Sequence, residues 1–294
     1  MRFAVVTDTS GNLQNQQIQE YGLTVIPFLY AYDGKEHTCL DSETFDGEAY
    51  YKMLKTTPVT TSQINPQTYA DTFLPFLKEG RDVLYVSMSS GISGSCQSAA
   101  IGAELALEEF PDRKIEIVDT RGASLGEGLL AIKAAELRDR DMDVSTAAKE
   151  LRKRAERLFN VFTVDDLMFL RRGGRLCNLA AVVGTVLHIK PILKGDPEGR
   201  IVAFGKVRGR KHSIEALAQQ YEKLVVSPET QTIGIAHAAC RSDAEYLMSL
   251  IKKLRPPKNV LLVDYEPVTG AHVGPGALAL FFESKPGVRA IPVL

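Results

Sequence analysis

Residues 83–108 read VLYVSMSSGISGSCQSAAIGAELALE, and this stretch decides the fold class. A short apolar run at 83–86 is followed by a serine- and glycine-rich loop, and then by apolar residues at helical spacing over 97–108. This order predicts a buried strand, a polar turn and a helix, the pattern of a βαβ unit. Residues 89–95 of the loop could hold a carboxylate or phosphate at the helix N-terminus, and a turn with serine N-caps explains them equally well.

The same alternation continues on both sides of this stretch. Strands are predicted at 3–6, 23–29, 115–118, 161–164, 201–207, 233–237 and 260–263, and a final apolar run lies at 277–282. Helices are predicted at 125–137, 144–157, 165–170, 213–225 and 243–254. Short β-branched runs between longer helical periods predict two α/β domains with mainly parallel sheets, residues 1–158 and 159–294. Ligands in such folds bind at the carboxyl ends of the strands.

Composition narrows the function classes. The chain has 294 residues, with 35 lysines and arginines against 36 aspartates and glutamates. The formal charge of -1 gives no general attraction to nucleic acid or anionic membranes, so we expect no nucleic-acid partner and at most transient membrane contact. No apolar stretch approaches the roughly 18 residues of a membrane span. The four cysteines are widely spaced, which predicts reduced thiols, no metal and no cofactor in a cytoplasmic protein.

Two further loops combine hydroxyl groups with turn signals. Residues 60–63, TTSQ, are predicted to form a polar loop between two helical stretches, where they are either an N-cap signal or a set of donors. Asp8 and Ser10, after the first strand, have the same two interpretations.

Basic residues and histidines supply the other candidates. Residues 170–175, LRRGGR, suit an anion or a solvated helix end. Residues 206–211, KVRGRK, suit an acidic partner or a solvated turn. His272 lies between glycines in GAHVGPG, residues 270–276, so we expect a shaped backbone rather than a helix face to position it, and a functional role is favoured. The remaining histidines are expected to be exposed or structural: His37, His212, His188 and His237.

Several common motifs are absent from the chain. A nucleophile elbow around Ser93 requires glycine two residues later, where Ser95 stands. No phosphate-binding loop or dinucleotide fingerprint occurs, which weighs against a phosphotransferase. A serine hydrolase acting on acyl esters through Ser93 and His272, oriented by an acid such as Asp264, is the alternative left open, because the order serine, acid, histidine matches α/β-hydrolases.

Taken together, the segments resemble the DegV family of fatty-acid-binding proteins, which includes the binding subunit of the bacterial fatty-acid kinase. The matching segments, in order, are residues 7–10 TDTS, 61–63 TSQ, 89–95 SSGISGS, 118–126 VDTRGASLG, 170–175 LRRGGR, 190–193 KPIL, 235–238 IAHA and 270–277 GAHVGPGA. Each is weak alone, and their joint order along the chain is specific.

The resemblance implies a lipid tunnel between the two domains and no catalytic residue in this chain. It implies that a long-chain fatty acid is bound through its carboxylate, which a separate ATP-dependent kinase phosphorylates, and that this protein also carries the acyl-phosphate product. The carboxylate ligands it implies are Thr61, Ser62, Ser93, Gly94, Arg175 and His272. The supporting positions are Asp8, Ser10, Gly91 and Gly274. The patch implied for kinase docking is Arg208, Arg210 and Lys211. A histidine beside a carboxylate would make affinity depend on pH near neutrality.

The chain also departs from the family pattern beside these loops. Ile64 and Asn65 follow Thr-Ser-Gln where proline is common, and Cys96 stands where an aromatic residue is common. These departures bear on loop shape and ligand preference rather than on the class of activity.

Overall fold

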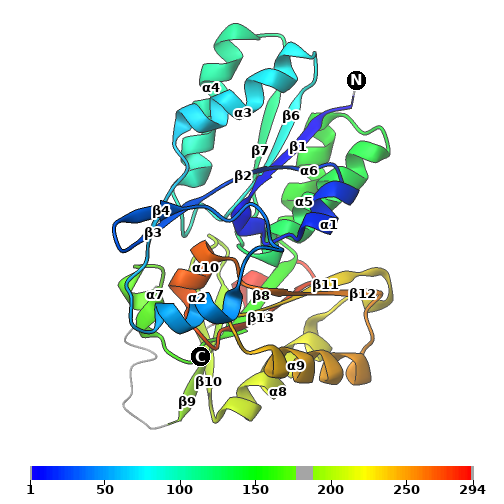
Figure 1. Ribbon diagram of the computed structural model, residues 1–294. Helices are drawn as coiled ribbons and strands as arrows, with labels where there is room; N and C mark the ends of the chain where they lie inside the picture. The colour runs from blue at the N-terminus through cyan, green and yellow to red at the C-terminus, as the bar shows by residue number, and fades with distance from the viewer. Residues whose placement is uncertain (1, 177–187, 293–294) are drawn as a thin grey trace. The chain divides into compact units, whose positions relative to one another are not determined.

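The computed structural model describes residues 2–176 and 188–292, and its contacts divide the chain into two compact units. Unit 1 comprises Met1–Phe45 and Thr60–Ala155, and unit 2 comprises Asp46–Val59 and Glu156–Leu294. Each unit has its own sheet with helices packed against it, so the prediction of an α/β protein is confirmed (Figure 1). Cys177 lies outside the described residues.

Unit 1 is built on a four-stranded parallel sheet in the order β2-β1-β6-β7. Its strands are β1 Ala4–Asp8, β2 Thr24–Ile26, β6 Val83–Ser87 and β7 Ile115–Asp119. Every residue of β1 and β6 is buried, as expected for central strands covered on both faces. A second sheet of three antiparallel strands has the order β4-β3-β5, with β3 Leu29–Tyr32, β4 Lys35–His37 and β5 Thr60–Ser62.

Helices cover both faces of the parallel sheet of unit 1. The pair α3 and α4 packs on one side, and α5 with α6 on the other (Figure 1). The helices of this unit are η1 Thr9–Gly11, α1 Asn15–Glu20, α3 Pro66–Lys78, α4 Ser95–Glu109, α5 Leu125–Asp139 and α6 Val144–Ala155. Asn65 caps α3 by accepting a hydrogen bond from Thr68 N at 2.9 Å, ahead of Pro66 at the first helical position. The departure at Asn65 therefore serves as a helix cap.

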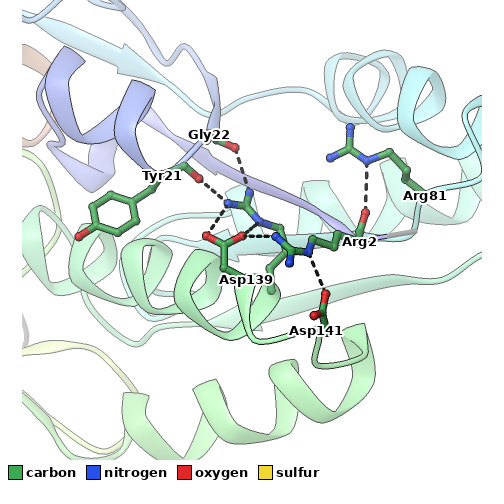
Figure 2. A network of polar contacts seen from close by, with 7 residues as sticks. Arg2, Tyr21, Gly22, Arg81, Asp139 and Asp141 are labelled. Atoms are coloured by element: carbon green, nitrogen blue, oxygen red, sulfur yellow. Dashed lines mark hydrogen bonds and ion pairs between the residues drawn. The ribbon is translucent and has the colours of Figure 1, made fainter.

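A network of polar contacts lies at the end of this sheet where its strands begin (Figure 2). The Arg138 guanidinium donates to Tyr21 O at 2.8 Å and to Gly22 O at 3.2 Å, which ties α5 to the turn before β2. Arg2 donates to Asp141 at 2.8 Å. The side chains of Arg2 and Asp141 are mostly exposed, so that ion pair contributes little to stability. The candidate binding residues of unit 1 lie at the opposite, carboxyl end of the strands.

Unit 2 contains a six-stranded sheet in the order β10-β9-β8-β13-β11-β12. Its strands are β8 Leu158–Thr163, β9 Ile189–Gly195, β10 Ile201–Arg208, β11 Thr232–His237, β12 Asn259–Asp264 and β13 Leu278–Glu283. Its helices are α2 Gly47–Leu54, α7 Met168–Arg172, α8 Arg210–Leu224, η3 Pro228–Thr230, α9 Arg241–Leu254, α10 Pro267–Val273 and η4 Val288–Ala290. Buried side chains of α8 and α9 form one apolar core with β8, β11 and β13.

The prediction of mainly parallel sheets holds in unit 1 and is wrong for the sheet of unit 2. Only β11 and β12 run parallel there among the described pairs, and they are joined through α9. The other pairs are antiparallel. Asp196 shapes the tight turn between β9 and β10 by accepting from Glu198 N and Arg200 N, and such a short connection can join only antiparallel strands.

The division of the chain differs from the single predicted boundary at residue 158. The segment Asp46–Val59, inside the first predicted domain, packs with unit 2. The hydroxyl of Tyr50 donates to Pro267 O and that of Tyr51 to Tyr265 O, both at 2.7 Å. Both tyrosines are buried, so α2 is part of the core of unit 2.

Candidate functional site

The serine-rich loop after β6 forms a compact turn that leads into α4. Ser89 is fully buried, its N–H donates to Gly122 O at 2.8 Å, and its hydroxyl accepts from Gly91 N at 3.1 Å. Ser93 is half-buried and Gly94 is exposed at the N-cap of α4. The first N–H groups of this helix lack partners within the helix, so the turn presents hydroxyl and amide donors together.

The 61–63 segment lies beside this turn within unit 1. A Cβ at Gly94 would overlap Oε1 at the end of the Gln63 side chain, so the two segments lie side by side. The hydroxyl of Ser98 in α4 also donates to Ile64 O at 2.6 Å. The structure therefore brings the 61–63 segment to the Ser93–Gly94 turn.

The prediction that residues 60–63 form a loop is wrong for the first three of them. Thr60–Ser62 forms β5, which pairs with β3 and places Thr61 opposite Tyr30. Threonine suits an extended strand because its β-carbon is branched, and a run of polar residues hides this preference. Thr61 is half-buried and Ser62 is exposed.

Asp8 and Ser10 lie in the core of unit 1 rather than on an exposed loop. Asp8 is 1% exposed and Ser10 is fully buried. Asp8 caps η1 by accepting from Ser10 N at 2.9 Å, and it also accepts from the hydroxyl of Tyr85 at 2.6 Å. Burial raises the pKa of Asp8 above its ordinary value, and it raises the pKa of the neighbouring Glu127 well above its own.

Glu127 is a residue that the sequence reasoning missed. Its carboxylate accepts from Thr7 Oγ1 and from Ser10 Oγ, each at 2.7 Å, and the residue is fully buried. The available signal was a lone acidic residue in the apolar stretch LGEGLLAI at 125–132. A buried acid is retained only where hydrogen bonds satisfy it.

In unit 2, His272 lies in the last turn of a helix, so the predicted non-helical position is wrong. The helix α10 begins at Pro267, and the Glu266 carboxylate caps it by accepting from Val268 N and Thr269 N, both at 2.6 Å. Gly274 has a φ of 76° and ends the helix, a conformation that favours glycine. A Cβ at Gly274 would also overlap the ring of Phe169.

The His272 imidazole packs against the end of α7. A side chain at Gly173 would overlap its Nδ1 atom, and Arg175 donates a hydrogen bond to Gly173 O. Burial, and secondarily the nearby Arg175 charge, lowers the pKa of His272 to about 4. The imidazole is therefore neutral near neutral pH, so the expected change of its charge in that range does not occur in this structure.

The acid of the hydrolase alternative contacts a different histidine. Asp264 Oδ1 lies 3.0 Å from Nδ1 of His237, which is 2% exposed. Neither ring nitrogen of His237 makes a hydrogen bond with the described residues, so the structural role that the sequence predicts for it stays a prediction. The contact with His237 gives Asp264 a role other than orienting His272, which argues against a Ser93–His272 hydrolase.

The members of the basic patch differ in their surroundings. Arg208 is exposed at the end of β10, and Lys211 is 74% exposed on α8. Arg210 is instead engaged within unit 2, since its Nε donates to Asp243 at 2.8 Å and its Nη1 lies 3.5 Å from Asp165. Arg210 and Lys211 border a hollow of about 450 Å³ between the starts of α8 and α9.

The part of the chain that the structure describes contains no helix with the length and apolar character needed to cross a membrane. The same residues contain no group of three or more histidine, cysteine, aspartate or glutamate side chains placed to hold a metal ion.

Comparison with known proteins agrees with this picture. The family described as "Uncharacterised protein, DegV family" matches residues 2–285. A DegV domain-containing protein of Clostridium perfringens is 36% identical over 282 residues, covering 96% of this chain and 97% of that relative.

Solved structures match along nearly the whole chain. The structure named "Fatty Acid Binding of a DegV family Protein", from Thermus thermophilus, has a TM-score of 0.86 at 29% identity and covers 97% of this chain and 100% of that one. A fatty acid binding DegV family protein of Streptococcus agalactiae has a TM-score of 0.84 at 29% identity, covering 97% and 99%. The fold is a two-unit α/β fold shared with these proteins. The chain belongs to the DegV family.

Proposed function

We propose that this chain binds a long-chain fatty acid and holds its carboxylate with the hydroxyls of Thr61 and Ser93. The observation that carries the proposal is the meeting of the 61–63 segment with the Ser93–Gly94 turn at the N-terminus of α4. The relatives from Thermus thermophilus and Streptococcus agalactiae, both named for fatty-acid binding, support the ligand class.

The chemistry of these groups suits a carboxylate. An ionised carboxyl group only accepts hydrogen bonds, and it must be met by donors when it leaves water. Thr61 and Ser93 each supply one hydroxyl, and Ser62 and Gly94 add neighbouring N–H groups. From unit 2 we propose His272 as a neutral N–H donor and Arg175 as a supporting cation, with Gly91 and Gly274 shaping the two backbones.

The acyl tail would supply most of the affinity. Each buried methylene contributes roughly 0.8 kcal/mol, so about 14 methylenes give on the order of 11 kcal/mol before the costs of association. This gain requires an apolar tunnel, and the interdomain tunnel implied by the family resemblance stays a prediction.

We further propose that a separate kinase phosphorylates the bound acid. A carboxylate oxygen would attack the γ-phosphorus of ATP held by the kinase, ADP would leave, and the acyl-phosphate would stay on this chain. Hydroxyl donors suit this role because they hold a carboxylate without pairing it with a full positive charge. Arg208 and Lys211 are exposed and are the proposed docking contacts, whereas the ion pairs of Arg210 make it a support for the patch.

Mass spectrometry tests the binding proposal. Protein purified from cells and then denatured should release a long-chain fatty acid, and stripped protein should take up added palmitate or oleate. No released acyl chain together with no uptake would refute the proposal.

A reconstituted reaction tests the kinase proposal. Addition of a fatty-acid kinase catalytic subunit and ATP to the loaded protein should produce acyl-phosphate, trapped with hydroxylamine as the hydroxamate. A fatty-acid-loaded protein that gives no hydroxamate with an active kinase would refute this step and leave the binding proposal intact.

A further inference from the structure

Thr61 lies on a short strand whose position depends on its neighbour β3. The strand β5 has three residues and stands at the edge of the order β4-β3-β5, so among the described strands it pairs with β3 alone. Thr61 lies opposite Tyr30 in this pair. The strands of this sheet have only three or four residues each, and a sheet of such short strands needs side-chain packing to be stable. The place of the Thr61 hydroxyl is therefore set by what holds β3.

Three aromatic rings join β3 to β4. The rings of Tyr32 and His37 are nearly parallel, with centroids 4.4 Å apart and an interplanar angle of 10°. The Tyr30 ring lies 5.4 Å from that of His37 and 6.2 Å from that of Tyr32. His37 is thus the central ring of the three, and all three side chains are half-buried. We call Tyr30, Tyr32 and His37 the aromatic stack.

The aromatic stack and Thr61 share one face of the sheet. Tyr30 is opposite His37 on one side and opposite Thr61 on the other, and opposed residues of neighbouring strands point to the same face. Tyr32 follows Tyr30 by two residues, which returns it to that face. The Cβ atoms of directly opposed residues are about 4.5–5.5 Å apart, so the Tyr30 side chain borders Thr61. A change in the aromatic stack therefore reaches Thr61 through one shared neighbour.

Polar contacts fix the two ends of this arrangement. Phe28, just before β3, donates its N–H to Thr9 Oγ1 at 3.0 Å, which ties the start of β3 to η1. Beyond Thr61, the Ser98 hydroxyl donates to Ile64 O at 2.6 Å, which ties the end of the segment to α4. Between these two anchors, Thr61 is held by its pairing with β3.

We propose that the aromatic stack positions the Thr61 hydroxyl for the carboxylate of the bound fatty acid. The inference rests on the proposed function, in which Thr61 is a carboxylate ligand. A hydrogen bond weakens steeply when it is misdirected, so a hydroxyl on a strand that shifts or twists loses much of its contact with the ligand. Stacked rings stabilise the pairing of two strands beyond the area that they bury. Tyr30, Tyr32 and His37 are positioning residues, since they act on the ligand through Thr61.

His37 offers a matched pair of variants for calorimetric titration with oleate. His37→Ala removes the central ring and should weaken oleate binding about fivefold, a part of the tenfold or more expected when a hydrogen bond to an ionised group is lost completely. His37→Phe keeps a flat ring at the same place and should restore the affinity to within about twofold of the wild type. Rescue by an apolar ring would show that the site requires the stack rather than an imidazole nitrogen.

Second substitutions show where the effect acts. Thr61→Val removes the hydroxyl and keeps the branched shape that suits a strand. In the Thr61→Val background, His37→Ala should cause no further loss of oleate affinity, because the hydroxyl that the stack positions is already gone. In the Ser93→Ala background the loss of about fivefold should persist, because Ser93 lies on a different loop. The decrease in the free energy of unfolding caused by His37→Ala should be the same in all three backgrounds, so stability does not account for this pattern.

A second variant covers the case in which His37→Ala does not fold. Tyr32→Leu keeps an apolar side chain on β3 and removes a ring of the stack. It should give a similar loss of oleate affinity, which should again disappear in the Thr61→Val background.

The outcomes separate the possible failures. Wild-type affinity of His37→Ala, a loss that His37→Phe does not reverse, or a loss that persists in the Thr61→Val background would overturn the inference while leaving fatty-acid binding intact. Wild-type affinity of Thr61→Val, or no oleate binding by the wild type, would instead refute the proposed function and this inference with it.

Discussion

Replacement of Ser93 by alanine should weaken the binding of every long-chain acid by the same factor. The Ser93 hydroxyl accepts from Ser95 N–H at 3.2 Å and lies 3.0 Å from Ser95 Oγ, which can donate to it when the Ser93 proton turns toward a carboxylate. These contacts are lost equally from the free and the bound protein, so their loss largely cancels in the binding equilibrium. What remains is one hydrogen bond to an ionised carboxyl group, worth about 1.5–3 kcal/mol. The expected loss of affinity is therefore about 10–150-fold.

The tail should contribute independently of this head-group contact. Laurate, myristate and palmitate differ by two methylenes at each step, and each step should add about 1.6 kcal/mol, or about fifteenfold in affinity. Calorimetric titration of the three acids should give two parallel series, with the Ser93→Ala series displaced toward weaker binding and the slope per methylene unchanged.

A matched control lies in the same loop. Ser90 is exposed, and its hydroxyl donates to Asp119 at 2.6 Å. Ser90→Ala should leave all three affinities within about twofold of the wild type. The reasoning is refuted if Ser93→Ala binds as tightly as Ser90→Ala, or if its loss of affinity changes with the length of the acid.

Three further predictions concern other parts of the account. Gly173→Ala should displace the imidazole of His272, because the new Cβ overlaps Nδ1. Palmitate binding in the same titration should weaken about fivefold. Unchanged binding would show that His272 does not contact the ligand. Glu127→Gln should make denaturant-measured stability less dependent on pH. The raised folded-state pKa of Glu127 gives the wild type stability at low pH that is lost as pH rises through that pKa, so equal pH profiles would contradict this. Arg208→Glu should reduce hydroxamate formation with the kinase by about tenfold or more without changing palmitate affinity, whereas full activity would exclude Arg208 from docking.

Local periodicity predicted most of the strands and longer helices. The run at 83–86 corresponds to β6 Val83–Ser87, and the helical spacing at 97–108 corresponds to α4 Ser95–Glu109. In both cases the apolar pattern repeats over enough residues to define a buried face. The short helix of His272 was missed because its seven residues include a glycine and are followed by two more, which hides any such pattern.

Other features depend on contacts between distant residues. The antiparallel pairing in unit 2 follows from short connections that periodicity does not reveal. The segment Asp46–Val59 packs with unit 2 through the hydroxyls of two tyrosines. Their acceptors lie far away in the sequence, and Tyr50 is separated from its acceptor by 217 residues. Glu127 lies 120 residues from its partner Thr7, and in the sequence it is a lone acid in an apolar helix.

A crystal structure of the protein loaded with palmitate tests the central claim most directly. The account predicts a carboxylate oxygen about 2.5–3.0 Å from both the Ser93 and the Thr61 hydroxyl oxygens, at the start of α4. A palmitate carboxyl group bound elsewhere, with neither hydroxyl in contact with it, would contradict the account.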